Sequence, residues 1–226
     1  VTDPPVTDEL DEVARITGHP AFSRLSRFHA LNHKAVGHRA AFELGKPYGA
    51  CRLVVAHLGG GISVGVHREG RVVDVNDAYD GAGPFSPERS GTLPAGQIVS
   101  KLGSEEYTTS EMRRIIVGKG GLVAHLGTND VREAEAMATP NAALVLEAMV
   151  YQIAKEIGAA ATVLAGVLDA VVITGSIARS GQIVEDLKRR ISFLGRVLVY
   201  PGEDELTALR DAALRVLAGE ETPCEY

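Results

Sequence analysis

A run of three glycines after a short apolar segment is the first candidate for anion binding. Residues 52–57 are apolar and rich in β-branched side chains, which is typical of a buried strand. Gly59, Gly60 and Gly61 would let backbone N–H groups approach a phosphate without interference from Cβ atoms. The segment is neither a P-loop nor a dinucleotide fingerprint, because no Gly-Lys-Ser/Thr follows and a strand, not a helix, comes next. A plain tight hairpin is the alternative.

A second candidate lies where an apolar strand runs into a turn of small residues. Residues 169–173 predict the strand, 174–176 the turn, and a helix follows. This arrangement presents helix N–H groups to a ligand at the carboxyl edge of a sheet. An ordinary strand-to-helix turn explains the pattern equally well.

Three histidines share a predicted helix. His29 and His33 are four residues apart, which is metal-ligand spacing on one helix face, and His38 follows. No Glu stands beside His29 as it would in a His-Glu-x-x-His zinc motif. Three readings stay open: a metal ligand, a satisfied surface histidine, or a histidine beside a transferring phosphoryl group.

Charged residues at turns and helix starts complete the candidates. Arg89 lies in a loop rich in Gly and Pro, where its guanidinium could clamp a carboxylate or phosphate in a bidentate manner. A surface ion pair with Glu88 is the alternative. Asp8 precedes a predicted helix and residues 203–205 open another, where acidic side chains commonly serve the helix dipole.

The elements that must position these residues alternate between strands and helices. An antiparallel meander is predicted at 52–57, 62–67 and 71–75, and the long loop at 76–94 is expected to pack back on the protein through Phe85. Further strands are predicted at 170–173 and 197–199. Helices are predicted at 7–16, 28–44, 95–102, 109–117, 131–137, 141–168, 183–191 and 206–217. An apolar stripe on the longest helix, broader than one sheet face requires, predicts self-association.

Composition narrows the class of protein. The 226 residues are 45% apolar and 23% charged, which is enough for a sizeable core without disulfides. A net charge of −6, without a basic run longer than 188–190, argues against a nucleic-acid partner. The two cysteines form no disulfide framework or metal pair. The longest apolar stretch, 158–168, is too short to cross a membrane, and the chain starts with no signal-peptide pattern. We therefore expect a cytoplasmic protein.

Six segments, in order and spacing, resemble the butyrate kinase branch of the acetokinase family, within the superfamily of acetate kinases, sugar kinases and actin. The resemblance runs from about Pro5 to Tyr226. It rests on residues 8–15 (DELDEVAR), 28–33 (FHALNH), 55–63 (VAHLGGGIS), 74–76 (DVN), 80–91 (DGAGPFSPERSG) and 200–203 (YPGE).

This resemblance implies a ribonuclease H-like, actin-like α/β domain: a mixed sheet made of an antiparallel meander extended by parallel strands, with helices on both faces. It implies transfer of the γ-phosphoryl group of ATP to butyrate, giving butyryl phosphate and ADP, with Mg²⁺ as the metal. The implied partners are a short-chain carboxylic acid and a second copy of the chain in a homodimer.

The resemblance also implies roles for particular residues. Arg89 would hold the substrate carboxylate and the moving phosphoryl group, His29 would stabilise the transition state, and Asp8 would lie near metal and substrate. Glu205 would help to place Mg²⁺ through water. The implied nucleotide contacts are His57, Leu58, Gly59, Gly60 and Gly61 in the hairpin, Asp130, Val131 and Arg132, and Gly175, Ser176, Ile177, Ala178 and Arg179 in the adenosine turn.

Two departures from the family pattern affect these expectations. The turn that reads Gly-Ile-Gly-Glu in acetate kinases is Gly-Ser-Ile-Ala at 175–178, so adenine contacts would differ in detail. Nothing matches the opening strand and Asn-x-Gly-Ser-Thr-Ser-like hairpin of the family. By resemblance, residues 1–200 form the second actin-like domain, and 201–226 form a helix that returns to a first domain outside the chain. The rival function is a non-catalytic nucleotide-binding or dimerisation fragment.

Overall fold

A five-stranded mixed sheet forms the centre of the protein. The computed structural model describes residues 9–25, 27–203 and 205–220. The strand order is β3-β2-β1-β4-β5. The antiparallel part contains β1 (Arg52–Leu58), β2 (Ile62–Arg68) and β3 (Arg71–Val75). Parallel pairing adds β4 (Ala170–Gly175) and β5 (Val197–Pro201) beside β1. The predicted meander extended by parallel strands is confirmed.

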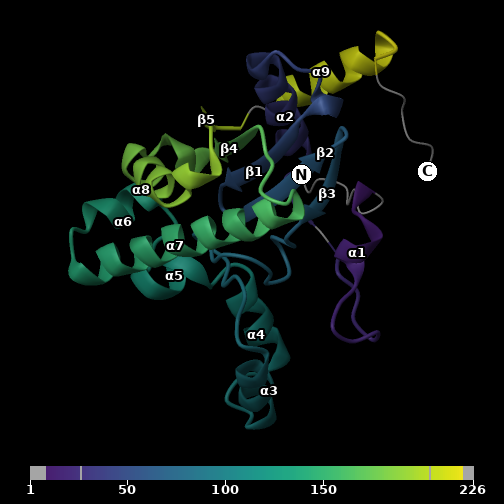
Figure 1. The fold of residues 1–226 in the computed structure, drawn as a ribbon. Helices are drawn as coiled ribbons and strands as arrows, with labels where there is room; N and C mark the ends of the chain where they lie inside the picture. The colour runs from purple at the N-terminus through teal and green to yellow at the C-terminus, as the bar shows by residue number, and fades with distance from the viewer. Residues whose placement is uncertain (1–8, 26, 204, 221–226) are drawn as a thin grey trace.

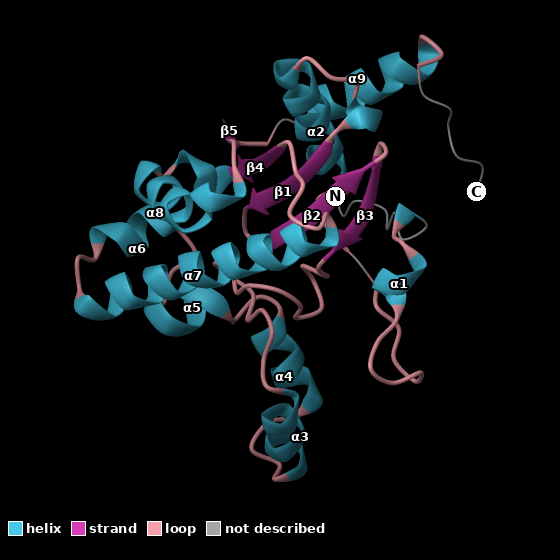
Figure 2. Ribbon diagram, viewed as in Figure 1, coloured by secondary structure: helices cyan, strands magenta, loops and turns pink. Residues whose placement is uncertain are grey.

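Helices cover both faces of this sheet (Figures 1 and 2). The long helix α7 (Pro140–Val163) and α8 (Gly181–Ile191) cover one face, and α2 (Ala30–Leu44) covers the other, with α9 (Glu205–Leu217) packed on α2. Strand β1 is buried on both sides because its alternate residues enter two different cores. Val54 faces the core of α7 and α8, whereas Val55 faces that of α2. A nearly continuous apolar run is what such a central strand requires.

Helix α7 is shorter than predicted and its apolar stripe is used within the chain. It begins at Pro140, with Thr139 as N-cap, and ends at Val163 rather than Leu168. Positive φ angles of 53° at Ala165 and 74° at Gly166 terminate the helix. Met149, Val150, Ile153 and Ile157 of the stripe are buried in the core below the sheet. The stripe therefore gives no argument for self-association, which stays a prediction from the resemblance alone.

The loop at 76–94 packs back on the sheet, as predicted. Asn76 accepts a hydrogen bond from the Val64 backbone and donates to the carbonyls of Ile62 and Ala82. Phe85 is buried against the core below the sheet. Polar anchors and one buried aromatic thus hold a segment that has no regular structure of its own.

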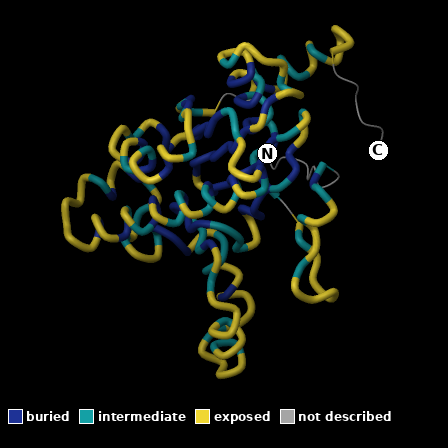
Figure 3. Tube along the Cα trace, in the orientation of Figure 1, coloured by how far each residue is buried: buried dark blue, intermediate teal, exposed yellow. Residues whose placement is uncertain are grey.

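A helical hairpin projects from this loop and is mostly exposed (Figures 1 and 3). It consists of α3 (Ala95–Gly103) and α4 (Thr109–Ile116), and a capping box at Thr108 and Glu111 begins the second helix. Two short helices lead back to the body of the protein, α5 (Gly121–Leu126) and α6 (Val131–Ala136). The sequence did not predict α5, which spans only six residues between two glycines.

The remaining elements are short. The predicted helix at 7–16 is reduced to α1 (Glu12–Arg15) among the described residues, and α2 begins at Ala30 instead of Phe28 because Phe28 packs into a small core beside β3. The described residues also contain 3₁₀ turns that were not predicted, among them η2 (Tyr48–Ala50), η3 (Ser176–Arg179) and η4 (Ser192–Leu194). Within the described residues, no helix is long and apolar enough to span a membrane.

Candidate active site

The glycine hairpin between β1 and β2 separates two polar regions. Its glycines lie close to side chains from distant parts of the chain. A Cβ atom on Gly59 would stand 2.9 Å from His57 Nε2 and 3.1 Å from Glu203 Oε1, and one on Gly61 would overlap the Arg89 guanidinium. A side chain at either position would push these groups away, so the packing around the hairpin requires glycine there.

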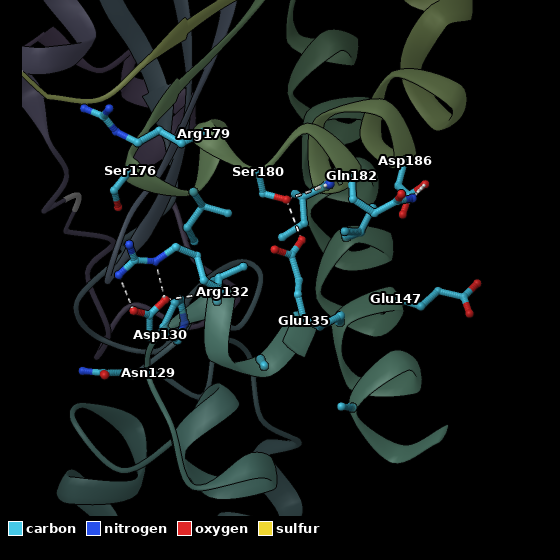
Figure 4. Close-up of a pocket in the computed structure, with 18 of the residues that line it drawn as sticks. Asn129, Asp130, Arg132, Glu135, Glu147, Ser176, Arg179, Ser180, Gln182 and Asp186 are labelled. Atoms are coloured by element: carbon cyan, nitrogen blue, oxygen red, sulfur yellow. Dashed lines mark hydrogen bonds and ion pairs between the residues drawn. The ribbon is translucent and has the colours of Figure 1, made fainter. Parts of the chain in front are cut away.

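On one side of the hairpin lies a cavity of about 970 Å³ (Figure 4). The hairpin, α6, α7, η3 and the start of α8 surround it. Its lining is apolar at Val131, Ala134, Ala142, Leu146, Val150, Ile177 and Ile183. Polar lining residues labelled in Figure 4 include Asn129, Asp130, Arg132, Glu135, Ser176, Arg179, Ser180 and Gln182. An apolar floor with a few polar groups around it is the usual make-up of a small-molecule site.

Eight of the thirteen predicted nucleotide contacts line this cavity, although they come from three separate segments. They are Gly59, Gly60, Asp130, Val131, Arg132, Ser176, Ile177 and Arg179. The other five, His57, Leu58, Gly61, Gly175 and Ala178, are not part of the lining. Leu58 and Ala178 belong to the core, and Gly175 has a φ of +92° with its α-carbon against the Leu58 backbone. Leu58, Gly175 and Ala178 therefore pack behind the residues that line the cavity.

Two polar contacts fix the shape of the cavity walls (Figure 4). Ser180 caps α8 by accepting from the Ile183 N–H, and its hydroxyl donates to Glu135 of α6 at 2.5 Å. Asp130 caps α6 by accepting from the Arg132 backbone at 2.8 Å and also pairs with the Arg132 guanidinium. The Arg132 contacts lower the pKa of Asp130 to about 2, so this carboxylate is ionised at neutral pH.

On the other side of the hairpin, histidines from α2 and β1 meet. The rings of His29 and His57 are stacked, with centroids 3.8 Å apart. His57 Nδ1 lies 2.8 Å from Asn32 Oδ1, and His57 Nε2 lies 3.2 Å from Glu203 Oε1, although this last contact is not directed along the ring N–H. The nearby His57 lowers the pKa of Glu203, which is therefore ionised at neutral pH.

His29 and His33 are joined by one hydroxyl group. Ser63 Oγ lies 2.9 Å from His29 Nδ1 and 2.9 Å from His33 Nε2. Burial, reinforced by the neighbouring His57, lowers the pKa of His29 to about 3, and burial also lowers the pKa of His33 strongly. Both imidazoles are therefore neutral at pH 7. His33 is fully buried, so the surface reading for this histidine is wrong.

Arg89 is half-buried beside the hairpin. Its guanidinium donates to the Ala78 carbonyl, lies 5.4 Å from the centroid of the Tyr79 ring, and packs against Gly61. The predicted alternative, a pair with Glu88, is not the arrangement found, because Glu88 accepts a hydrogen bond from Asn129 instead. A guanidinium held against a glycine turn is well placed to meet an anion there.

Two acidic site residues implied by the resemblance, Asp8 and Glu205, stay predictions. Asp8 lies outside the described residues, and Glu205 begins α9 without a described side chain. In the part of the chain that the structure describes, no three His, Cys, Asp or Glu side chains gather as a metal site, so the metal reading of the histidines gains no support.

Sequence reasoning missed three polar partners at this site: Asn32, Ser63 and Glu203. Signals existed for two of them: Asn32 is three residues from His29 on the same helix face, and Ser63 is a polar residue between Ile62 and Val64. Glu203 was noted only as an acidic residue at a helix start, and it is the pairing of β4 with β5 that brings residue 203 to the hairpin.

Together these groups suit the transfer of a phosphoryl group from one anion to another. One hairpin end gathers glycine backbone, a guanidinium and a neutral imidazole, and a ligand-sized cavity opens directly behind it. Phosphoryl transfer depends on positioning and charge stabilisation by donors of this kind more than on covalent chemistry.

Comparisons with solved structures support the same fold. An acetate kinase from Porphyromonas gingivalis superposes with a TM-score of 0.81 at 23% identity, over 92% of this chain and 61% of the other. A propionate kinase from Francisella tularensis gives 0.77 at 21%, over 88% and 59%. An acetate kinase from Entamoeba histolytica gives 0.77 at 19%, over 91% and 63%. The chain thus spans about three fifths of these structures.

The predicted fold class is confirmed by these superpositions: the chain has the mixed α/β actin-like ATPase fold, with a five-stranded sheet between helices. The sequence profile of the Acetokinase family matches residues 22–208, which include the hairpin, the residues that line the cavity, and His29, His33 and His57. On that match the chain belongs to the acetokinase family.

Proposed function

We propose that this chain is the nucleotide-binding part of a kinase that transfers the γ-phosphoryl group of ATP to butyrate, giving butyryl phosphate and ADP. The observation that carries the proposal is the convergence of three distant segments on one cavity, whose glycine hairpin also adjoins His57 and Arg89. The family supports a carboxylate as acceptor, because relatives of similar fold are named acetate and propionate kinases.

The cavity suits a nucleotide. Its apolar floor, which includes Leu146 and Ile177, offers a surface for a base, and acidic groups at its wall can accept hydrogen bonds from ribose hydroxyls. Gly59 and Gly60 line the cavity, and Gly59 also lies against His57. At Gly60 a Cβ atom would meet nothing closer than 3.9 Å, which leaves room for phosphates against the backbone.

The chemistry requires donors rather than a strong base. A carboxylate is already ionised at pH 7, so it can attack the γ-phosphorus without losing a proton. The Arg89 guanidinium would neutralise charge on the acid and on the transferring oxygens, and His29 would donate one hydrogen bond as a neutral imidazole. Backbone N–H groups of the hairpin would hold the remaining phosphates.

Mg²⁺ fits this site as an ion bound largely through the nucleotide. Magnesium usually keeps several waters and takes only one or two carboxylates, so a closed protein cage is not needed. Glu203 is a described, ionised carboxylate beside the hairpin and could hold it directly or through water. When bound, the ion would offset the charge of the phosphates.

The choice of butyrate rests on the order of motifs, which resembles the butyrate kinase branch. It is tested by comparing kcat/KM for acetate, propionate, butyrate and isobutyrate. One methylene in an apolar pocket changes the rate constant by about 10–200-fold, so a preferred length will be visible. Equal values for the four acids would overturn the choice of butyrate.

The domain boundaries are also part of the proposal. Residues 1–200 would form the second domain of an actin-like kinase, and 201–226 would return towards the first. Helix α9 supports this: one side packs on α2, while Leu206 and Leu217 are 80% and 83% exposed.

A hydroxamate assay for acyl phosphate separates the kinase from its rival, a nucleotide-binding fragment without activity. Turnover of about 1 per second or more, an ordinary enzyme rate, supports a kinase in this chain. ATP binding without turnover supports the fragment, and absence of ATP binding contradicts both. The variant Gly60→Ala, which adds a methyl group at the cavity, should weaken ATP binding if the nucleotide occupies this cavity.

A further inference from the structure

A continuous chain of hydrogen-bonding groups leads from His29 away from the cavity to Tyr48. His29 Nδ1 and His33 Nε2 each lie 2.9 Å from Ser63 Oγ. His33 Nδ1 lies 3.3 Å from His67 Nε2, and His67 Nδ1 lies 2.7 Å from the Tyr48 hydroxyl. We call these five side chains the histidine relay. The function proposed above uses only the first of them.

Local periodicity explains how the relay is assembled. His29 and His33 are four residues apart at the start of α2 and face the sheet, while Ser63 and His67 are four residues apart on one face of β2. Tyr48, in η2 just after α2, closes the far end. The start of α2 thus places two polar side chains, His29 and His33, against two polar side chains of β2, Ser63 and His67.

The interior of the relay is buried and closely fitted. Ser63, His33 and His67 are completely buried. A Cβ atom on Gly37 would stand 2.8 Å from the Tyr48 ring and 3.3 Å from His67 Nδ1, and one on Gly65 would stand 3.0 Å from His33 Nδ1. Two glycines, one on α2 and one on β2, therefore leave the space that these contacts need.

Every histidine of the relay is neutral, so each ring has one N–H and one acceptor nitrogen. Burial lowers the pKa of His29 and of His67 to about 3, and that of His33 strongly. Two orders of donors satisfy every group of the relay. Either Tyr48 donates to His67 and all protons point towards His29, or all bonds are reversed and His29 donates from Nδ1 to Ser63. If Ser63 Oγ accepted from both histidines, its buried hydroxyl proton would have no acceptor among the described residues.

The contact at the Tyr48 end favours the first order. A phenol O–H is a stronger hydrogen-bond donor than a neutral imidazole N–H, and an imidazole nitrogen is a stronger acceptor than a phenol oxygen, so Tyr48 donates to His67 Nδ1. The charged groups at the two ends do not decide the order: Lys34 near Tyr48 is paired with Glu9 at 2.8 Å, and at His29 the Glu203 carboxylate is opposed by His57 and Arg89.

We propose that the histidine relay holds His29 in the tautomer with its proton on Nε2, so that a neutral imidazole presents a fixed N–H donor to the transferring phosphoryl group. Tyr48, His67, His33 and Ser63 are then positioning residues. The inference rests on the proposed role of His29. A neutral imidazole in the other tautomer would turn a lone pair towards the phosphoryl oxygens and repel them.

The direct test reads the tautomers without any activity measurement. In this chain labelled with ¹⁵N-histidine, long-range proton–nitrogen correlation spectra distinguish protonated from unprotonated ring nitrogens. We expect His29, His33 and His67 to carry the proton on Nε2 throughout pH 6 to 8. A proton on Nδ1 of His29, or a mixture of its tautomers, would overturn the proposal.

Two variants break the relay at different points. Ser63→Ala removes the hydroxyl next to His29, and we expect mixed tautomers at His29 and a kcat for acyl phosphate about tenfold lower, with KM for ATP unchanged. Tyr48→Phe removes one oxygen at a half-exposed position, so folding is not at risk, and we expect mixed tautomers at His67. Tyr107→Phe on the projecting hairpin is the matched control and leaves the spectra unchanged.

The outcomes separate this inference from the function on which it rests. A fixed His29 tautomer in a chain that binds ATP but forms no acyl phosphate overturns the kinase while the relay stands. Normal kcat in Ser63→Ala with mixed His29 tautomers overturns the relay's role while the kinase stands. Unchanged His67 spectra in Tyr48→Phe overturn the assignment of Tyr48 as the donor that orders the relay.

Discussion

The two sides of the glycine hairpin are built in opposite ways. The histidine side is closed: Ser63, His33 and His67 are fully buried and each is hydrogen-bonded. The cavity side is open and apolar at its floor, and its ion pair between Asp130 and Arg132 is exposed to solvent. A rigid, buried arrangement suits groups that must meet a transition state, whereas an open apolar cavity suits a ligand that must enter and leave.

This contrast is sharpest between pH 7 and 5, where the buried histidines stay neutral although free histidines take up a proton. Histidines whose pKa falls on folding bind fewer protons in the native state than in the unfolded chain, so stability decreases as pH falls below about 6.5. Each contributes a slope of about 1.4 kcal/mol per pH unit until its folded pKa is reached. Urea unfolding at pH 7, 6 and 5 measures the loss.

The variant His67→Gln removes one of these groups and should make that slope shallower. His19→Gln, an exposed histidine in the segment before α2, is the matched control and should leave the slope unchanged. A wild-type stability that stays constant from pH 7 to 5 would contradict the picture of neutral, buried histidines.

Variants of Arg89 test whether phosphoryl transfer depends on the groups opposite the cavity. In the full-length kinase we expect Arg89→Ala to lower kcat by about 10²–10³, because one preorganised charged donor is lost, and to raise KM for the acid while ATP binding stays the same. Arg89→Lys should recover little, since a point charge cannot reproduce the fork. Steady-state kinetics with folding checked by circular dichroism measure both.

An unchanged rate in Arg89→Ala would mean that this side chain only fastens the loop to Ala78 and Tyr79. A surface arginine on α4, Arg113, provides the matched control, and Arg113→Ala should behave as wild type.

Neighbouring glycines of the hairpin adjoin different sides: Gly60 lines the cavity, and Gly59 also lies against His57 and Glu203. Gly60→Ala meets open space, so we expect normal folding but about tenfold weaker ATP binding, the effect of roughly 1.4 kcal/mol. Gly59→Ala displaces His57 and Glu203, so it should lower kcat more than it weakens ATP binding. Calorimetric titration and kinetics compare them, and identical behaviour of the two variants would remove the distinction between the sides.

The smallest effect is expected at the outer wall of the cavity. Ser180→Ala removes the cap of α8 and the bond to Glu135, which should cost about 1 kcal/mol and lower Tm by about 2–4 °C. Thermal unfolding followed by circular dichroism measures it. Ser104→Ala, at an exposed helix end, should change Tm by less; an equal shift in both would show that Ser180 contributes no more than an ordinary surface serine.

The local sequence pattern predicted the strands and the longer helices correctly, and its errors lie mainly at the ends of these elements. The apolar run of β1 and the glycines after it predicted a buried strand and a hairpin, because alternation and backbone freedom are properties of consecutive residues. The end of α7 was missed by five residues, because a left-handed turn at Ala165 and Gly166 outweighs an apolar run that continues to Leu168. Short α5 had no periodicity to detect.

The amino-acid sequence by itself determined which residues could do chemistry: the hairpin glycines, Arg89, His29 and the segments at 130–132 and 175–179. What only the tertiary structure decided is which of them share a space. The pairing of β1 with β4 joins two of these segments at one cavity, and β5 brings Glu203 to His57. Such contacts join residues more than a hundred positions apart, and no local rule of spacing can express them, because they depend on how strands pair across the whole sheet.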